Sequence, residues 1–297
     1  MENRNTNILH DMGGWSQFFF LWFLFFSGLM LASVAVLLLM SPERMMNSAA
    51  SMRMAMAIQT ICLFVVPALA FTYICQSRPK EYLKVENEFK LPLLFFAIVF
   101  IVAVQPIILA LSYYNQQLSL PDSLAPLEEW MKNSEASASA SLNLLFEDHT
   151  IFGLIFNLLV LAVVAGLGEE LFFRGCIQQI MQKIFKNTHA AVWLGAVIFS
   201  AMHFQFYGFF PRVLLGAFLG YIFVWSANIW IPVIIHTMHN AINIILTYIL
   251  YKTPEYDQME AFTFDSNTIL IISSLVVSVI SLFLIYRNKI ARNLKTK

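Results

Sequence analysis

Charge and cysteine are both scarce in this sequence. Asp, Glu, Lys and Arg make up only 12% of its 297 residues, about half of the roughly 25% that is usual in globular domains. The 18 basic residues balance 18 acidic ones, so net charge gives no reason to expect a nucleic-acid partner. The three cysteines, Cys62, Cys75 and Cys176, lie in or beside apolar segments and form no C-x-x-C pair. We interpret them as packing residues and expect no thiolate metal site.

Apolar residues take the place of the missing charge. Hydrophobic residues make up 59% of the chain, and Phe alone occurs 28 times. This composition favours an all-α polytopic membrane protein over a soluble enzyme. Segments that are long enough, or nearly so, to cross about 30 Å of hydrocarbon are residues 17–40, 54–75, 91–114, 150–167, 189–203, 210–225, 229–251 and 268–286. Pro67 and Pro106 fall inside two of these eight segments and are expected to kink their helices.

No internal repeat or second domain is visible, so residues 1–297 are predicted to form a single integral membrane domain. Its expected parts are N-terminal helices over 17–114, an acidic outer loop over 115–149, a core over 150–250, and a last helix with a basic tail over 268–297. Apolar residues recur at helical spacing in the acidic loop, at Leu124, Leu127, Trp130 and Met131. This pattern is typical of an amphipathic helix on the membrane surface, either simply packed there or closing over a site as a lid.

Lysine and arginine are distributed unequally over the loops between these segments. If the N-terminus faces the cytoplasm, 13 of the 18 basic residues fall in cytoplasmic parts of the chain. The outer parts hold the other five, which are Arg44, Arg53, Lys132, Arg212 and Lys252. By the positive-inside rule, this bias predicts that both termini are cytoplasmic.

The most unusual stretch begins at Gly168 and reads Gly-Glu-Glu-Leu-Phe-Phe-Arg-Gly. In the 17 residues before it, Asn157 is the only polar side chain. Ionisable groups in a membrane segment cost about 2.5–3.5 kcal/mol each on insertion scales, so by default they indicate function. In a helix, Glu170 and Arg174 share a face, whereas Glu169 points about 100° away. One carboxylate can therefore be bound by the arginine while the other stays reactive.

Further polar residues lie in the membrane segments that follow. His203 closes the fifth segment, and His236 and Asn240 share one helical face in the seventh. Together with Glu169, they form a reagent set for peptide hydrolysis, with the carboxylate as base for water and the imidazole and amide as donors to the oxyanion. Alternatively, Glu169, His203 and His236 are a three-ligand set for Zn²⁺ that leaves one position for water. The H-E-x-x-H motif of many zinc proteases is absent.

Short motifs follow one another on separate membrane segments, namely E-E-x-x-x-R (Glu169, Glu170, Arg174), F-x-x-x-H (Phe199, His203) and H-x-x-x-N (His236, Asn240). Their order resembles the CAAX-processing and bacteriocin-processing intramembrane protease family (CPBP, or Abi), whose members are relatives of the prenyl-protein endoprotease. The G-x-x-x-G-Y run that begins at Gly216 also looks like this family and favours close helix packing. The motif region covers residues 150–250, about a third of the chain.

The resemblance implies about eight membrane helices around a polar cavity, and hydrolysis of a peptide bond in a membrane-associated or lipidated substrate. On the family pattern, Glu169 activates water, His203 completes the site, and His236 and Asn240 stabilise the oxyanion. Glu170 and Arg174, the other two residues of the first motif, would support Glu169. The resemblance leaves open a metalloprotease with Zn²⁺ and a metal-free glutamate protease. It favours a bacterial inner membrane, and His239, which has no counterpart in the motifs, is interpreted as a local packing or hydrogen-bonding neighbour.

One expectation conflicts with the estimated helix lengths. Glu169 falls near the cytoplasmic end of segment 150–167, and His203 falls near the outer end of segment 189–203. Helices of this length span roughly 23–27 Å at 1.5 Å per residue, so the two side chains could not meet. Either the helix that carries Glu169 continues toward Lys186, or the helix that carries His203 begins later and is tilted.

Two other functions are compatible with the sequence. A catalytically silent immunity or scaffold protein would bind a peptide or a membrane protein and tolerate replacement of Glu169 and the histidines. A proton-coupled transporter would use Glu169, Glu170 and His236 as a relay, although no inverted repeat is visible. Peptide hydrolysis uses more of the motifs than either alternative, so it is the main interpretation.

Overall fold

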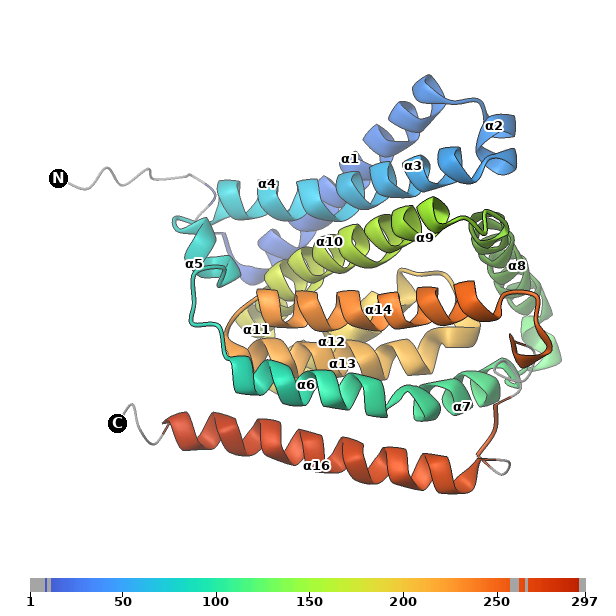
Figure 1. The fold of residues 1–297 in the computed structure, drawn as a ribbon. Coiled ribbons are helices and arrows are strands. Elements are labelled where there is room, and N and C mark those ends of the chain that lie inside the picture. The colour runs from blue at the N-terminus through green and yellow to red at the C-terminus, as the bar shows by residue number, and fades with distance from the viewer. Residues whose placement is uncertain (1–8, 10–11, 257–261, 265–266, 294–297) are drawn as a thin grey trace.

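The computed structural model describes residue 9 and residues 12–256, 262–264 and 267–293. Every regular element in this part of the chain is a helix (Figure 1). Among the described residues, six helices are long and apolar enough to cross a membrane, and a bent pair raises the number to seven. The predicted all-α polytopic fold is therefore confirmed, and each of the eight predicted segments overlaps one or more helices.

Three spans are single helices, namely α1 (Gly14–Leu39), α14 (Trp230–Leu250) and α16 (Thr268–Asn293). Two spans are built from a few consecutive elements, one from α3 (Ala49–Thr60), η1 (Ile61–Val65) and α4 (Val66–Cys75), and the other from η5 (Phe206–Gly208) and α13 (Phe209–Ser226). The longest span is built from α9 (Ile151–Asn157), η3 (Leu158–Val164), α10 (Ala165–Phe172), η4 (Phe173–Ile177) and α11 (Gln178–Phe185). The bent pair is α6 (Leu91–Ala103) and α7 (Gln105–Gln116). The remaining helices are α2 (Pro42–Asn47), α5 (Pro79–Leu83), η2 (Asp122–Leu124), α8 (Ala125–Glu147) and α12 (Thr188–Ala201). With 14 residues, α12 is only about 21 Å long.

The two prolines act differently. The helices α6 and α7 meet at Val104 with a bend of 45°, directly before Pro106, as predicted. Proline lacks the backbone N–H and its ring clashes with the preceding turn, so a kink there is expected. Pro67 lies in the first turn of α4, directly after the π-helical turn η1, and the span from α3 to α4 stays continuous.

The predicted segment 150–167 is too short. In the structure, the helix continues through the charged stretch and ends at Phe185, after 35 residues. The π-helical turns η3 and η4 lie on either side of Glu169. The predicted segment ended directly before the charged stretch, whereas Glu170 and Arg174 lie within the span and are 0% and 2% exposed among other helices.

Figure 1 shows how the helices are layered. The long helix from α9 to α11 runs through the middle, between α1, α3 and α4 on one side and α13 and α14 on the other. The pair α6 and α7 lies beyond α14, and α16 packs along it at the far edge. The helix α8 crosses one end of the bundle, and α5 lies at the opposite end. The motif-bearing helices are thus surrounded by other helices.

The apolar loop residues singled out in the sequence lie in or beside α8, a helix of 23 residues. Trp130 packs against Phe204 and Phe206, with ring centroids 6.2 and 5.2 Å apart. Leu124 and Leu127 remain 43% and 45% exposed. The first half of α8 therefore contacts the loop between α12 and α13.

A buried cation joins the other end of α8 to the membrane helices. Arg53 on α3 is 7% exposed, and its Nη1 lies 2.8 Å from Oδ2 of Asp148. Its Nε donates to Oδ1 of Asn157 at 2.7 Å. Both Arg53 and Asn157 also donate to the carbonyl oxygen of Leu145. Asn157, the one polar residue of its apolar run, therefore helps to fix the end of α8.

Replacing Arg53 by alanine is expected to lower the free energy of unfolding by about 3 kcal/mol, because Asp148 and Asn157 lose a buried partner. Asp148 is 30% exposed, so solvent keeps the loss at the lower end of the range for buried pairs. Thermal unfolding in detergent measures the effect. Arg44→Ala, at an exposed position on α2, is the matched control and should stay within about 0.5 kcal/mol of wild type. Equal losses in both variants would contradict the assignment.

Candidate active site

A helical hairpin brings two of the predicted site residues to the same depth. The helix α11 ends at Lys186, which has a left-handed φ of 51°, and Asn187 caps the start of α12. Lys186 lies 17 residues after Glu169, and His203 lies 17 residues after Lys186. Two helical arms of equal length return to the same level, so Glu169 and His203 meet. Of the two ways to remove the conflict in helix lengths, the longer helix is the correct one.

Glu169 faces both predicted histidines. Its Oε2 atom lies 3.9 Å from Nε2 of His203 and 3.7 Å from Nε2 of His236. These separations are too long for direct hydrogen bonds. Among the described residues, Oε2 is buried without a hydrogen-bond partner. The side chain of Glu169 keeps an exposure of 12%, against 0% for Glu170. The two adjacent carboxylates therefore lie in different surroundings.

Glu170 is the carboxylate that the protein binds. Its Oε1 accepts hydrogen bonds from Nη1 of Arg174 at 2.6 Å and from Nδ1 of His236 at 2.8 Å. Arg174 also donates to the carbonyl oxygen of Gly216 at 2.9 Å, and its guanidinium lies 5.0 Å from the centre of the Phe199 ring. These contacts join α10, α12, α13 and α14. They also fix the orientation of His236 toward Glu169.

Hydrogen bonds at Nδ1 determine what each imidazole presents to Glu169. Nδ1 of His203 lies 2.8 Å from the carbonyl oxygen of Phe199, and Nδ1 of His236 faces the Glu170 carboxylate. Carbonyl and carboxylate oxygens accept, so Nδ1 carries the proton in both rings. The Nε2 atom that faces Glu169 is therefore an acceptor in a neutral ring and a donor in an imidazolium.

A cavity of about 730 Å³ opens in front of these groups. All four residues that the sequence predicted to be catalytic line it, namely Glu169, His203, His236 and Asn240. Asn240 donates from Nδ2 to the carbonyl oxygen of Leu161, which lies in the π-helical turn η3. Such turns are frequent at functional sites because they displace backbone groups from the regular helix pattern.

Glu169, His203 and His236 are also the ligand set that the sequence suggested for Zn²⁺. Their donor chemistry suits the ion, since both rings are bound at Nδ1 and present Nε2. Their spacing does not, because tetrahedral ligands at about 2.0–2.2 Å from zinc lie roughly 3.3 Å from one another. Among the described residues, no group of three His, Cys, Asp or Glu side chains is arranged to hold a metal ion. As placed, the three side chains do not fit zinc.

A comparison with protein families matches this part of the chain. Residues 151–242 match the family described as type II CAAX prenyl endopeptidase Rce1-like. This segment, about a third of the chain, contains all three motifs and the hairpin that aligns them. In this segment the chain is similar to the CAAX protease family. Neither the curated proteins nor the solved structures contain a match to it.

The Rce1-like segment contains a positively charged residue, Arg212, that lines the cavity but was not predicted to do so. Arg212, assigned above to an outer loop, lies in the span of η5 and α13 and lines the cavity. Its guanidinium donates to the backbone oxygen and to the side-chain oxygen of Gln205. A charge inside an apolar segment was the signal that could have placed it. Arg53, assigned to the same loops, likewise lies within a span.

His239 also lines the cavity of the Rce1-like segment, but other side chains bind it. Its Nδ1 lies 3.0 Å from Nε2 of Gln105, at the kink between α6 and α7. Its Nε2 lies 3.3 Å from Nδ2 of Asn243. This histidine is therefore hydrogen-bonded locally, in agreement with its interpretation from the sequence.

Replacing Gly216 by valine is expected to destabilise the protein by about 1–3 kcal/mol, because the position is overpacked. A Cβ atom there would lie 3.1 Å from both Ala196 and Phe199 on α12. Activity should fall as well, since Phe199 and the carbonyl of residue 216 both contact Arg174. Gly13→Val is the control, because a Cβ at that glycine meets no described residue within 4 Å. Melting temperatures that are equal for the two variants would contradict the close packing.

Proposed function

We propose that this protein is an intramembrane endopeptidase that hydrolyses a peptide bond in a membrane-associated or lipidated substrate. The observation that carries the proposal is the Glu169 carboxylate facing two imidazole nitrogens, at 3.7 and 3.9 Å, on the wall of a cavity between membrane helices. The Rce1-like match supports the same class of reaction.

Glu169 acts first as a base in this mechanism. A substrate water placed between its carboxylate and the two imidazoles gives Glu169 a proton, while the water oxygen forms a bond to the carbonyl carbon. His203 and His236 orient that water through Nε2. Glu169 then gives the proton to the leaving nitrogen as the C–N bond breaks. The carboxylate is thereby regenerated, and the products are a new carboxyl group and a new amine.

The oxyanion of the intermediate needs hydrogen-bond donors. Asn240 offers an amide from the wall of the cavity. His236 offers Nε2–H only as an imidazolium, because Glu170 accepts its Nδ1–H.

The lipid bilayer is the expected solvent of this protein, since its spans carry many exposed apolar side chains. The bias of basic residues supports cytoplasmic termini, and the bacterial inner membrane is the location that we propose. Arg4, Lys295 and Lys297 contribute to this bias and lie outside the described residues. In this topology α8 closes the outer end of the bundle. Its last three turns line the cavity, so we propose that substrate passes beside this helix.

The test is cleavage by the full-length protein in lipid nanodiscs. One set of peptides is prenylated and ends in a C-a-a-X sequence, and the other is unmodified and membrane-proximal. Cleavage by wild type but not by Glu169→Gln supports the proposal. Binding without cleavage by both proteins supports the scaffold or immunity function instead. If the wild-type protein binds one equivalent of zinc and His203→Ala does not, the water would be activated by a metal ion and not by the carboxylate alone.

A further inference from the structure

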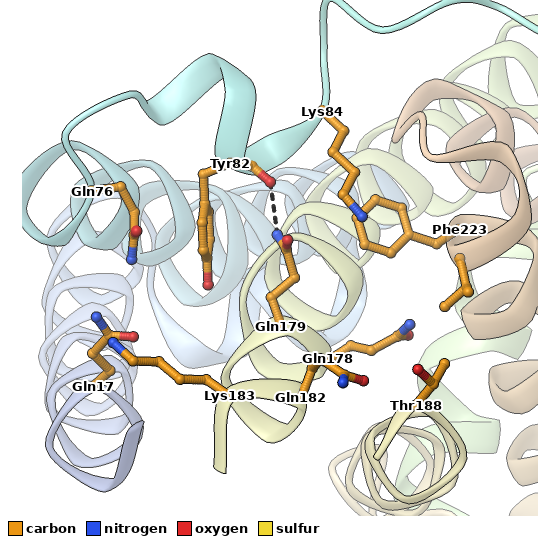
Figure 2. Close-up of a pocket in the computed structure, with 11 residues that line it drawn as sticks. Gln17, Gln76, Tyr82, Lys84, Gln178, Gln179, Gln182, Lys183, Thr188 and Phe223 are labelled. Carbon is orange, nitrogen blue, oxygen red and sulfur yellow. Dashed lines mark hydrogen bonds between the residues drawn. The ribbon is translucent and has the colours of Figure 1, made fainter. Parts of the chain in front are cut away.

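A second pocket lies at the α5 end of the bundle, away from α8 (Figures 1 and 2). Its volume is about 370 Å³, and it shares no lining residue with the active-site cavity. The walls come from the ends of α1, α4, α11 and α13, together with the start of α12 and the segment around α5. Peptide hydrolysis makes no use of this pocket.

The lining of this pocket is polar and basic. Its polar members are Gln17, Gln76, Gln178, Gln179, Gln182, Tyr82, Thr188, Lys84 and Lys183. Within the described part of the chain, no residue that lines the pocket is Asp or Glu. Figure 2 shows Gln17, Gln76, Tyr82 and Lys183 pointing toward one another on one side of the pocket, with Lys84 on the other side. Two ammonium groups and several amide and hydroxyl donors thus face one space that no described acidic residue lines.

Two of the glutamines are buried where membrane helices normally place apolar residues. Gln17 on α1 is 2% exposed and Gln178 on α11 is 5% exposed. Gln178 donates to the carbonyl oxygen of Gly220, whereas no described residue hydrogen-bonds the side chain of Gln17. The amide of Gln17 lines the pocket and is therefore available to hydrogen-bond a polar ligand there.

The two lysines are also without acidic partners among the described residues. The ammonium of Lys84 lies 4.3 Å from the centre of the Phe223 ring, and Lys183 donates to the carbonyl oxygen of Met12. By contrast, Lys80 on the outside of α5 pairs with Glu86 at 2.8 Å. The positive charge inside the pocket is therefore available to an anion.

We propose that this pocket binds the phosphate group of an anionic phospholipid headgroup. Phosphate takes both charge-assisted bonds from lysine and neutral bonds from amide and hydroxyl donors, which is the donor set present. Basic pockets between helix ends on the cytoplasmic side typically bind anionic headgroups, and the basic-residue bias places this end in the cytoplasm. A phosphoglycerol group suits the pocket, since glutamine amides can bind its hydroxyls while the acyl chains remain in the bilayer.

The experiment measures lipid binding to the full-length protein in detergent by native mass spectrometry. The probes are phosphatidylglycerol, phosphatidylcholine and glycerol 3-phosphate. Lys84→Gln and Lys183→Gln test the pocket. Lys186→Gln is a close control for Lys84→Gln. Lys84 and Lys186 both have a left-handed φ, 58° and 51°, but Lys186 does not line the pocket. Melting temperatures are measured alongside, and if one pocket variant fails to fold, the other carries the test.

Wild type and Lys186→Gln are expected to bind phosphatidylglycerol about tenfold more tightly than phosphatidylcholine. Either pocket variant should lose about that factor. If glycerol 3-phosphate competes with phosphatidylglycerol, phosphate is the recognised group. If glycerol 3-phosphate binds as tightly as phosphatidylglycerol, the natural ligand would be a soluble phosphate ester and not a lipid. Equal binding of phosphatidylglycerol by all four proteins would overturn the site, as would equal binding of the two lipids by wild type. Neither lipid binding nor the melting temperature depends on peptidase activity.

Discussion

Glu169→Gln is expected to lower kcat for peptide cleavage by about 10²–10⁴-fold while leaving the folded state intact. Glutamine has nearly the shape of glutamate but cannot take a proton from water. Oε2 makes no hydrogen bond to a described residue, so the substitution removes no structural contact of this atom. Initial cleavage rates and melting temperatures, taken on the same preparation, measure both parts of this prediction.

The matched control for this variant is Glu147→Gln. Glu147 is exposed at the end of α8, pairs with Lys252 at 3.4 Å and does not line the cavity that contains Glu169. Its replacement is expected to change neither kcat nor melting temperature measurably, since exposed pairs contribute little. Wild-type kcat in Glu169→Gln would show that hydrolysis does not pass through this carboxylate.

Glu170→Ala is expected to lower the free energy of unfolding by about 3–5 kcal/mol, because it leaves Arg174 buried without its partner. The side chains of Arg174 and Glu170 are 2% and 0% exposed, so solvent cannot replace the lost contact. Activity should also fall, because His236 loses the acceptor that orients it. Denaturant unfolding in detergent micelles measures the stability, and the cleavage assay measures the activity.

Removing both charges separates the two roles of this pair. The double variant Glu170→Leu/Arg174→Met should recover most of the lost stability, because a buried ion pair can be replaced by apolar side chains at little cost. It should not recover activity, since His236 still lacks its acceptor. Unchanged stability in Glu170→Ala, or full activity in the double variant, would contradict the supporting role assigned to Glu170 and Arg174.

Hydropathy predicted the spans because the bilayer selects for length and apolar content alone. It failed at residue 167, where two carboxylates and a guanidinium looked like the end of a helix. Burial of Glu170 and Arg174 among other helices removes the reason to end it there. Tertiary contacts of this kind, between residues as far apart as Arg174 and Gly216, are not visible in a local pattern.

The site was predictable in its residues more than in its geometry. Chemistry and motif order pointed to Glu169, His203 and His236, and the structure places their side chains together. The hairpin turn at Lys186 makes this possible, and its equal arms can be counted in the sequence once the turn is known. Arg212 was missed because it was counted with the outer parts of the chain, although it lies inside the predicted segment 210–225. The two imidazole tautomers could not be predicted, since they depend on contacts with other residues.

In the proposed reaction Glu169 activates one water, and cleavage in heavy-oxygen water tests this most directly. Wild-type protein in nanodiscs should place one heavy oxygen atom in the new carboxyl terminus of the peptide product, and none in Glu169 after a single turnover. Glu169→Gln should give no labelled product above background. Heavy oxygen found in the Glu169 side chain would make this residue a nucleophile, and labelled product at the wild-type rate from Glu169→Gln would contradict its role altogether.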